Sequence, residues 1–417
     1  MGGFAEKNGR AGSPLPADSL AETAWPMVRL GDVCEEIRER IPSSKVSREG
    51  YITTDNMVKG CGGVRISESL PVGVGLVKYQ AGDILLSNIR PYLKKVWLAD
   101  HGGGCSSDVI VFRVASSGLS PEYLYRALSQ DAFFDYSMQN VSGTKMPRGK
   151  RDWIKQFEFP LPPLSVQREI VERLEKELGE TEKITAGFRR IAENAEAEFK
   201  AELDETFKAL EEDVSRGGAR TRRVRLGDVC ETITDGDWIE SKDQSSDGIR
   251  LVQTGNIGNG RFEHKDFRAK YISTDTFERL HCTEIFQGDV LVSRLPEPVG
   301  RACIVEGIGK RMITAVDCTI IRFKGLIDSR YFIAYSQSGQ YRSAIVSLVT
   351  GSTRSRISRK NLESILVLVP PLPIQHSIVS RLDTARERCD KINAEAEKGL
   401  KAAENLRKAI LKEAFEQ

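Results

Sequence analysis

The sequence repeats itself, and this feature limits the possible folds more than any other. Residues 28–37 read VRLGDVCEEI, and residues 224–233 are identical at nine of these ten positions. Two further motif pairs return in the same order: GDILLS at 82–87 with GDVLVS at 288–293, and LPPLSVQ at 161–167 with VPPLPIQ at 369–375. Three ordered landmarks at nearly one spacing indicate a tandem duplication. The chain should therefore form two related globules.

Each copy has the same predicted order of elements. Short β-branched runs bounded by Gly and Asp predict strands, as at 82–87 and 108–114 in the first copy. A helix should follow, with Ser120 as its N-cap and Pro121 in its first turn. A basic loop, a last apolar strand and a proline-rich stop complete the unit. We expect an α+β globule of about 140 residues in each copy.

After each proline stop, the spacing of apolar residues changes to that of a long helix. In the C-terminal segment they recur every four and three residues, the a/d spacing of a coiled coil: Ile378, Leu382, Ala385, Cys389, Ile392, Ala396, Gly399, Ala403, Leu406 and Ile410. The central segment has a rougher version: Ile170, Leu174, Leu178, Ile184, Phe188, Ile191, Ala195, Phe199, Leu203, Phe207 and Leu210. We expect the two helices to pair as an antiparallel coiled coil. The alternative is that each helix packs on its own globule.

These patterns predict five segments. Residues 1–24 form a disordered N-terminal lead-in, rich in Gly, Pro, Ala and Ser. Residues 25–163 form the first globule, and residues 164–221 the central long helix and a linker. Residues 222–371 form the second globule, and residues 372–417 the C-terminal long helix.

Several classes of protein are disfavoured by the composition. None of the eight cysteines lies in a C-x-x-C pair, so we expect reduced, mostly buried thiols and no metal. The N-terminus lacks the apolar core of a signal peptide, and no stretch reaches the ~18 apolar residues that cross a membrane. We therefore expect a soluble, cytoplasmic protein that makes no membrane contact.

A net charge of +2 conceals two basic loops. Residues 142–151 and residues 351–360 each carry four cations and no acid. Lys and Arg beside Gly, Ser and Thr suit a loop that contacts phosphates, because charge displaces counterions and small residues let the backbone approach. One such loop is more often a solvated surface. Its recurrence at equivalent sites favours nucleic-acid binding.

The whole arrangement resembles the specificity subunit of Type I restriction-modification enzymes. The shared features are two variable globules, each closed by a Gly-Ser/Thr basic loop, a PLPPLxxQ-like motif and a long helix, with a VRLGDV opening and a SNIRPYLKK stretch at 87–95. The resemblance covers the chain from about Trp25 onward. It implies target recognition domains that each read half of a bipartite double-stranded DNA site.

The resemblance also implies what this chain leaves to its partners. The paired helices would hold the globules apart and dock two DNA methyltransferase (modification) subunits, with restriction subunits as an optional addition. Those partners would bring S-adenosylmethionine and methylate adenine at N6, so no cofactor is expected on this chain.

Candidate DNA contacts fall in loops that differ between the copies and in the two basic loops. Arg, Lys, Asn and Gln read base edges, so unlike side chains at equivalent places predict unlike half-sites, hence an asymmetric target. The predicted base readers are Asn88, Arg90, Arg294 and Arg301. The further predicted contacts, mostly to phosphates, are Asn56, Lys94, Thr144, Lys145, Arg148, Lys150, Arg151, Asn256, Ser352, Thr353, Arg354, Arg356, Arg359 and Lys360.

Nothing in the sequence predicts catalysis by this chain. It has no Asn-Pro-Pro-Tyr/Phe motif of an amino-methyltransferase, and Gly309-Lys310 lacks the upstream Gly and following Ser/Thr of a P-loop. Its four histidines show no nucleophile or metal spacing. Three alternatives remain: a stand-alone DNA-binding regulator, a specificity subunit for a fused nuclease–methyltransferase, and a coiled-coil adaptor that binds no nucleic acid.

Overall fold

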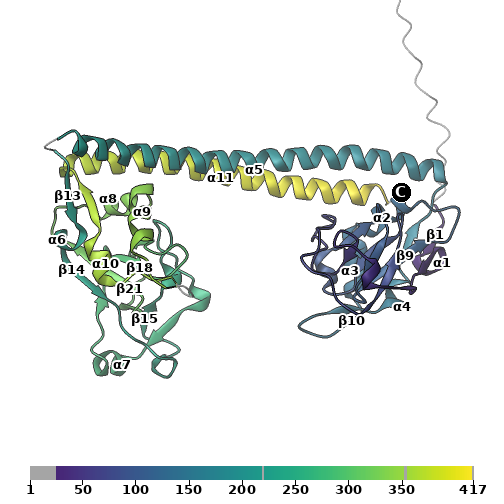
Figure 1. Cartoon of the computed structure of the whole chain (residues 1–417), viewed down its shortest axis with the longest axis horizontal. Helices are drawn as coiled ribbons and strands as arrows, with labels where there is room; N and C mark the ends of the chain where they lie inside the picture. Colours follow the sequence, from purple (N-terminus) through teal and green to yellow (C-terminus); the bar gives the residue numbers. More distant parts are fainter. Residues whose placement is uncertain (1–24, 218–219, 352–354, 416–417) are drawn as a thin grey trace, which may run out of the picture. The chain divides into compact units, whose positions relative to one another are not determined.

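The computed structural model describes residues 25–217, 220–351 and 355–415. The predicted lead-in at 1–24 lies outside these ranges. The chain divides into two compact units (Figure 1): unit 1 contains Met1–Gly187 and Gly399–Gln417, and unit 2 contains Phe188–Lys398. Each unit therefore holds one globule together with part of both long helices.

The globule of unit 1 is built on two four-stranded sheets. The first has the order β2-β9-β6-β7 and is antiparallel throughout: β2 (Cys34–Glu36), β9 (Val109–Val114), β6 (Ile84–Ser87) and β7 (Val96–Leu98). The second has the order β3-β5-β8-β4, with β4 parallel to β8: β3 (Arg40–Pro42), β5 (Gly75–Tyr79), β8 (Gly103–Cys105) and β4 (Tyr51–Ile52). Apolar side chains of β6 and β9 are buried on both faces.

Shorter elements close the first globule. β1 (Met27–Arg29) pairs antiparallel with the last strand, β12 (Glu158–Pro160). The remaining elements are α1 (Leu30–Val33), η2 (Pro91–Leu93), α2 (Pro121–Leu128), α3 (Asp131–Met138), the hairpin of β10 (Val141–Ser142) and β11 (Arg148–Gly149), and α4 (Arg151–Ile154). The Ser120 hydroxyl accepts a hydrogen bond from the Tyr123 amide at 3.1 Å, which confirms the predicted N-cap.

Unit 2 repeats the first sheet and most of its surroundings. Its order β14-β21-β18-β19 matches β2-β9-β6-β7: β14 (Cys230–Asp235), β21 (Cys318–Phe323), β18 (Val290–Ser293) and β19 (Ala302–Ile304). The other counterparts are β13 (Arg222–Arg225) paired with β22 (Leu366–Val369), α6 (Leu226–Val229), α8 (Ser329–Tyr335), α9 (Gly339–Leu348) and α10 (Arg359–Ser364).

The second sheet of unit 2 has loops of its own. Its order is β16-β15-β20-β17, with β15 parallel to β20: β16 (Lys270–Ile272), β15 (Ile249–Val252), β20 (Met312–Thr314) and β17 (Glu284–Ile285). η5 (Asp266–Arg268) precedes β16 and α7 (Thr274–Arg279) follows it. The duplication thus includes three strands of the second sheet, because β4-β8-β5 and β15-β20-β17 each contain one parallel and one antiparallel pair. The copies diverge in the outer strands, β3 and β16, and in the loops.

The two long helices, α5 (Leu164–Ser215) and α11 (Leu372–Glu413), run antiparallel within each unit. In unit 2, Arg386 of α11 pairs with Glu196 of α5, whereas Arg381, earlier in α11, reaches Thr206, later in α5. In unit 1, the start of α5 shares a core with the end of α11. The predicted α+β class, with duplicated globules and antiparallel long helices, is confirmed.

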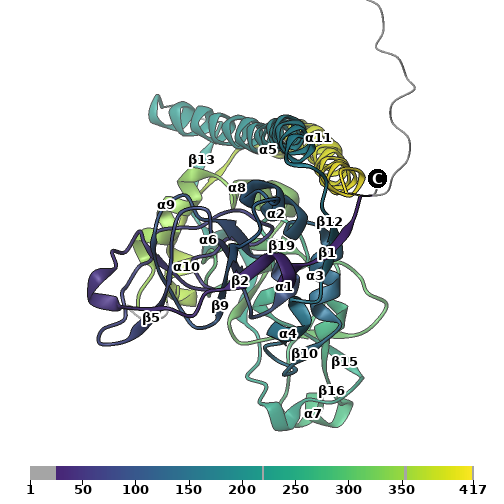
Figure 2. The same cartoon turned by 90° about the vertical axis from the view of Figure 1, so that its right-hand side faces the viewer.

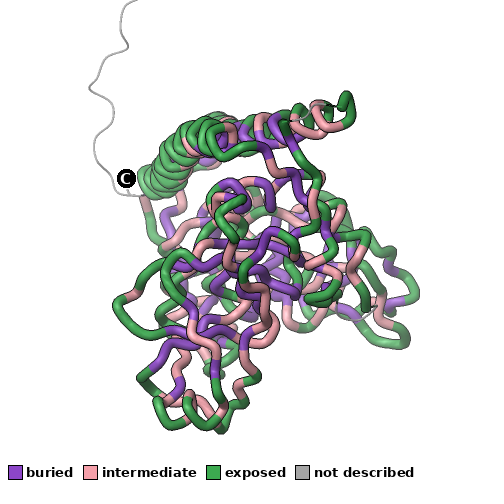
Figure 3. Tube along the Cα trace, turned by 90° about the vertical axis from the view of Figure 1, so that its left-hand side faces the viewer, coloured by how far each residue is buried: buried purple, intermediate pink, exposed green. Residues whose placement is uncertain are grey.

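Each globule also packs against the helices, so both of the predicted arrangements occur. In unit 2, residues 195–207 of α5 and 378–389 of α11 share one core with Tyr331 and Phe332 of α8. In unit 1, α2 has the equivalent place beside Leu174 and Phe415, and Figures 1 and 2 show α2 on the side of its globule nearest the helices. The outward turns of the helices stay exposed (Figure 3).

Four predicted seam positions are wrong, because Ile184, Ile191, Ile392 and Leu406 are 38–48% exposed. Ile184 follows the buried Leu178 by six residues, a step that turns it about 120° away from the seam. Ile191 lies one heptad further on and stays on the outward side. The irregular spacing of the central segment therefore breaks the seam at Ile184 and Ile191.

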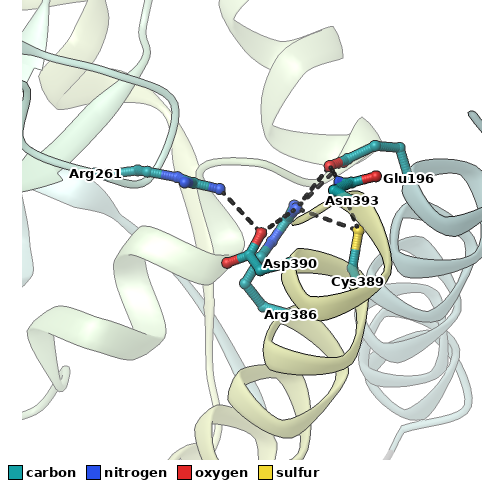
Figure 4. Close-up of polar contacts among 6 residues, drawn as sticks. All are labelled: Glu196, Arg261, Arg386, Cys389, Asp390 and Asn393. Atoms are coloured by element: carbon teal, nitrogen blue, oxygen red, sulfur yellow. Dashed lines mark hydrogen bonds and ion pairs between the residues drawn. The ribbon is translucent and has the colours of Figure 1, made fainter. Parts of the chain in front are cut away.

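A polar cluster joins the helices to the globule in unit 2 (Figure 4). Glu196 of α5 accepts hydrogen bonds from Arg386 at 3.1 Å and from Asn393 at 2.8 Å, both on α11. Arg261, from a loop of the globule, pairs with Asp390 of α11 at 3.4 Å. Burial raises the pKa of Glu196, but the bonds from Arg386 and its neighbours outweigh burial and lower it. Because polar partners must match across the pair, this cluster favours one helix register.

The repeated Gly-Asp motif has a structural role in both copies. Asp83 accepts two hydrogen bonds from Arg113 at 2.7 Å, and Asp289 accepts two from Arg322 at 2.8 and 2.7 Å. Each carboxylate also caps the turn before its strand, accepting a backbone N–H three residues upstream. The aspartate thus fixes the start of β6 and β18 against β9 and β21.

The glutamine of each proline-rich motif joins three parts of its unit. The Gln375 side chain accepts from the Asp328 amide at 2.8 Å and donates to the carbonyls of Leu326 at 2.9 Å and Pro370 at 2.7 Å. Gln167 makes the equivalent bonds at 2.7–2.9 Å in unit 1. Both side chains are fully buried. They fix the first turn of each long helix against the loop before α2 or α8.

Replacing this glutamine should destabilise its unit. Gln375→Leu fills similar space but leaves one N–H and two carbonyls without partners, so we expect the free energy of unfolding of unit 2 to fall by about 2–4 kcal/mol. Thermal unfolding followed by circular dichroism measures the shift. Ser377→Ala, at an exposed position of the same helix, is the control. Equal melting temperatures for the two variants would contradict the structural role.

Candidate nucleic-acid interface

The first predicted basic loop is a hairpin attached to the end of β6. β10 and β11 pair with each other, and β11 also bridges to the chain that continues β6. The Arg90 amide donates to the Pro147 carbonyl at 2.7 Å, and the Gly149 amide donates to the Asn88 carbonyl at 3.2 Å. Residues 88–94, 106–108 and 141–151 therefore meet at one edge, which we call the first edge.

Five predicted contacts on the first edge are exposed: Arg90, Thr144, Lys145, Arg148 and Lys150. Arg148 forms an ion pair with Asp108 at 3.3 Å, and both side chains are at least 40% exposed. An ion pair this exposed contributes about 0–1 kcal/mol. These cations are therefore available to another negatively charged group at little cost.

Arg151 is held by a buried carboxylate. Glu36, whose side chain is only 4% exposed, contacts Arg151 at 2.5 Å, Lys155 at 2.6 Å and Arg38 at 3.0 Å. Burial opposes ionisation of Glu36, but hydrogen bonds from Arg38, Lys155 and Arg151 outweigh it and lower its pKa to about 2. Arg151 also donates to the Ser107 carbonyl at 2.8 Å. Arg151 thus connects the first edge to β2, and it is less available to a ligand than the neighbouring cations.

Unit 2 repeats this construction at a second edge, formed by residues 235–238, 294, 315–317 and the described part of 350–360. Thr350 bridges to Arg356, and the Ile357 amide donates to the Arg294 carbonyl at 3.2 Å. Arg356 pairs with Asp317 at 2.9 Å, as Arg148 does with Asp108. The basic hairpin and its aspartate are thus duplicated together.

The remaining predicted contacts of this loop differ in their surroundings. Arg359 lies 3.2 Å from Glu363 and 3.9 Å from Asp235, and Lys360 is exposed. Ser352, Thr353 and Arg354 lie outside the described residues, so their predicted contacts stay predictions.

Asn88 and Arg294 occupy equivalent positions beneath the two hairpins. Their amides donate to the carbonyls of Asp108 at 2.8 Å and Asp317 at 2.9 Å. They are 9% and 5% exposed, and each has one buried polar atom without a hydrogen-bond partner, Asn88 Oδ1 and Arg294 Nε. Arg294 also pairs with Asp235 at 3.2 Å, and burial lowers the pKa of its guanidinium. The two copies thus place an asparagine and an arginine at equivalent positions of the same scaffold.

Arg301, predicted to read bases, is built into the interior. It is 8% exposed and donates to four backbone carbonyls at 2.6–3.1 Å: those of Thr254, Ile257, Leu295 and Pro298. Burial lowers the pKa of its guanidinium. These contacts join the 254–257 turn to the 295–298 loop, which accounts for the side chain without DNA.

Two asparagines and a lysine from the predicted contacts also hold loops together. Asn56 accepts from the Thr53 amide at 2.7 Å and donates to two carbonyls at 2.8 and 2.9 Å. Asn256 makes the same kind of turn, at 2.7–3.2 Å. Lys94 pairs with Asp131 at 2.6 Å. All three stabilise the protein's own loops.

Sequence reasoning missed two exposed aromatic residues at these edges. Tyr92 of η2 is 50% exposed, and Trp238, three residues after Asp235, is 71% exposed. Tyr92 lies within the SNIRPYLKK stretch, but its exposure could not be read from residue type. Trp238 lies in a loop of the divergent second copy, where the repeat gives no guide.

Among the described residues, no three His, Cys, Asp or Glu side chains cluster so that they could hold a metal ion. All eight cysteines are free, and burial raises the pKa of the Cys34 thiol to about 12. In the part of the chain that the structure covers, every helix is too short or too polar to cross a membrane.

Comparison with known proteins identifies the family. A model of the Type I restriction modification DNA specificity domain matches residues 22–187 and 221–402, one match for each copy. The chain belongs to this Type I specificity family. Membership confirms the resemblance inferred from the motifs.

Two curated relatives, both named as Type I specificity subunits, match this chain over part of their length. The chain is 33% identical over 99 residues to the Type I restriction enzyme EcoDI specificity subunit of Escherichia coli, covering 24% of this chain and 22% of that protein. It is 24% identical to the putative Type I specificity subunit S.HindORF215P of Haemophilus influenzae, covering 64% of each chain. The chain thus spans less than two thirds of both.

A solved structure extends the likeness to the whole fold. It concerns complex assembly and conformational transition of the type I R-M system, and one of its chains superposes with a TM-score of 0.70 at 22% identity, covering 94% of this chain and 98% of that one. At this identity the likeness shows the fold alone.

The Glu36 cluster gives the specificity fold a predictable response to acid. Because the pKa of Glu36 falls from 4.5 to about 2 on folding, its carboxylate stabilises the protein fully above about pH 4.5 and loses this effect as the pH falls toward 2. We expect Glu36→Gln to lower the free energy of unfolding by about 2–3 kcal/mol at neutral pH, and by progressively less below pH 4.5. Urea denaturation over this range measures the difference.

The control is Glu35→Gln, at an exposed position of the same strand. The difference in free energy of unfolding between wild type and Glu36→Gln should shrink below pH 4.5. If it stays constant from neutral pH into the acid range, the three cations do not lower the pKa of Glu36.

Proposed function

We propose that this chain is the DNA-reading subunit of a Type I restriction-modification complex, with one half of a bipartite target bound at each edge. The observation that carries the proposal is the duplicated edge. In both copies an arginine–aspartate pair holds a basic hairpin over a buried side chain, and that side chain is Asn88 in one copy and Arg294 in the other.

The exposed cations would supply the phosphate contacts. Double-stranded DNA binds Lys and Arg largely by releasing counterions, which needs charge but little fixed geometry. Lys145 and Lys150 are exposed. Arg148 and Arg356 are in partly exposed ion pairs, in which a phosphate could take the place of the aspartate. Phosphate contacts position a protein on DNA without reading its sequence.

Sequence reading would come from what differs between the edges. Asn and Arg have different preferred bases, Asn for adenine and Arg for guanine. Asn88 and Arg294 are the two predicted readers that lie at equivalent positions in the two copies, and one is an asparagine and the other an arginine. We assign Asn56, Asn256 and Arg301 to holding the loops, because all of their side-chain polar atoms are bonded to the protein's backbone. Arg294 also donates to the Val316 carbonyl, but its Nε and the Asn88 Oδ1 have no partner. An asymmetric target follows from this proposal.

The chemistry would belong to partner subunits. We propose that two modification subunits dock on the long helices and bring S-adenosylmethionine for adenine-N6 methylation, and that restriction subunits join where cleavage occurs. This chain would supply DNA binding and position its partners, with no cofactor of its own.

A map of modified bases tests the proposal directly. Genomic DNA from cells with this gene intact or deleted would be sequenced for N6-methyladenine. We expect deletion to remove methylation from one split, asymmetric motif, since each edge reads a different half. Restoring the gene on a plasmid is the control. A palindromic motif would contradict the asymmetric reading, and unchanged methylation in cells that express the gene would contradict the function.

The phosphate contacts predict a change in salt dependence. In the complex with its modification subunits, Lys145→Gln combined with Lys150→Gln should weaken binding to all duplexes alike. The negative slope of log K against log salt should become less steep by about 2, because each lost phosphate contact removes about 0.9 from its magnitude. Fluorescence anisotropy at several salt concentrations measures it.

Lys45→Gln, at an exposed position of η1 (Ser43–Lys45) and outside both edges and the long helices, is the matched control. If the double variant keeps the wild-type slope, these lysines make no phosphate contacts.

A further inference from the structure

Each edge presents one aromatic ring to water. Tyr92 is 50% exposed at the first edge, and Trp238 is 71% exposed at the second. Burying an aromatic ring removes a large apolar surface from water, so a ring left exposed is a favourable contact not yet made. The two rings come from different loops, since Tyr92 follows β6 and Trp238 follows β14.

The loop that carries Tyr92 is held in an unfavourable conformation. Arg90 and Lys94, on either side of η2, have φ of +51° and +52°, in the left-handed region that costs a non-glycine residue about 1 kcal/mol. Backbone bonds fix this shape: Gly60 to Leu93 at 3.0 Å, Cys61 to Lys94 at 2.7 Å, and Arg90 to Pro147 of the basic hairpin at 2.7 Å. The position of Tyr92 is thus set before any ligand arrives.

The backbone that carries Trp238 is equally well anchored. The Asp237 amide donates to the Thr314 carbonyl at 2.8 Å, its carbonyl accepts from Val316 at 2.9 Å, and its side chain accepts from the Thr283 amide at 2.8 Å. Three residues of extended chain span at most about 11 Å, so Trp238 lies within that distance, Cα to Cα, of Asp235. Asp235 in turn contacts Arg294 and Arg359.

The surroundings of both rings favour DNA as the ligand. Protein interfaces place aromatic rings in a core depleted of charge. The exposed cations on the edge of Tyr92 are Arg90, Lys145, Arg148 and Lys150. Those on the edge of Trp238 are Arg356, Arg359 and Lys360, although the Trp238 side chain also hydrogen-bonds the Glu240 carboxylate in its own loop. Cations that hold phosphates beside an anchored aromatic ring are the combination that stacks on bases or wedges between them.

We propose that Tyr92 and Trp238 insert against the bases of the two half-sites and unstack or stack on them when the DNA binds. The inference rests on the proposed function and adds an apolar contact that neither the basic loops nor the predicted base readers supply. Because the rings come from different loops, they would meet their half-sites at different base steps. This adds a second source of asymmetry, through the deformability of the DNA.

The test uses the complex of this chain with its modification subunits and a duplex carrying the mapped motif. Tyr92→Ala and Trp238→Ala should each weaken specific binding about 10–100-fold, the loss expected for one stacked base. The salt slope should stay unchanged, because no phosphate contact is removed. 2-Aminopurine placed through each half-site should change its fluorescence on binding in the wild type, brightening where a base is unstacked and dimming where a ring stacks on it. The alanine variant of that edge should not show this change.

Conservative and matched variants separate this role from folding. Tyr92→Phe and Trp238→Phe keep a ring and should retain most of the affinity and the 2-aminopurine signal. Phe267→Ala removes a ring that is 82% exposed on η5, outside both edges, and should have no effect. Melting temperatures of all variants should match the wild type, since each ring is at least half exposed.

Two results would overturn the inference. One is binding by Tyr92→Ala and Trp238→Ala that equals binding by Phe267→Ala. The other is loss of the modification subunits from the purified alanine variants, which would make the rings protein contacts. In either case a wild-type complex that still methylates the split motif would leave the proposed function standing, whereas a wild-type complex with no motif would refute that function itself.

Discussion

The fold depends on covering the apolar stripes of the two long helices. A helix of 52 residues, α5, cannot leave such a stripe in water, and each stripe is covered partly by the other helix and partly by a globule. One tyrosine in each copy joins the three parts. Tyr123 contacts the Phe415 ring, in the turn after α11, with centroids 5.2 Å apart, and its hydroxyl donates to the Pro160 carbonyl of β12 at 2.8 Å. Tyr331 repeats this against Phe207 and Leu368.

Because the scaffold is held in this way, the loops at the edges can vary without loss of the fold. The bonds that position each basic hairpin run between backbone groups or to an aspartate, so they do not depend on the side chain beneath. Asparagine at 88 and arginine at 294 therefore fit the same backbone. A duplicated scaffold with exchangeable side chains is a physical route to two unlike recognition surfaces from one sequence unit.

Short-range patterns were enough to predict the elements but not the surroundings of polar side chains. Strands β6 and β9, the Ser120 cap and the pairing of the helices follow from local spacing and repetition. Arg301 shows what cannot be predicted: its four carbonyl partners lie at 254–257 and 295–298, and residue type does not reveal that they converge. Ile184 is outside the seam because one irregular step of six residues shifts the phase. The remaining predicted contacts with DNA stay predictions.

The charges of the edges divide into two kinds, and this division explains how a nearly neutral chain can present a basic surface. Glu36 holds Arg151 and Lys155 from a buried position, so these cations serve mainly to shape the first edge. Arg148 and Arg356 instead pair with partly exposed aspartates, where water screens the attraction. A phosphate can replace such a partner while the buried pairs stay intact. Because each exchange costs little, a ligand that offers several phosphates in the right positions would gain more than an isolated anion, which agrees with the proposed binding of a nucleic-acid backbone.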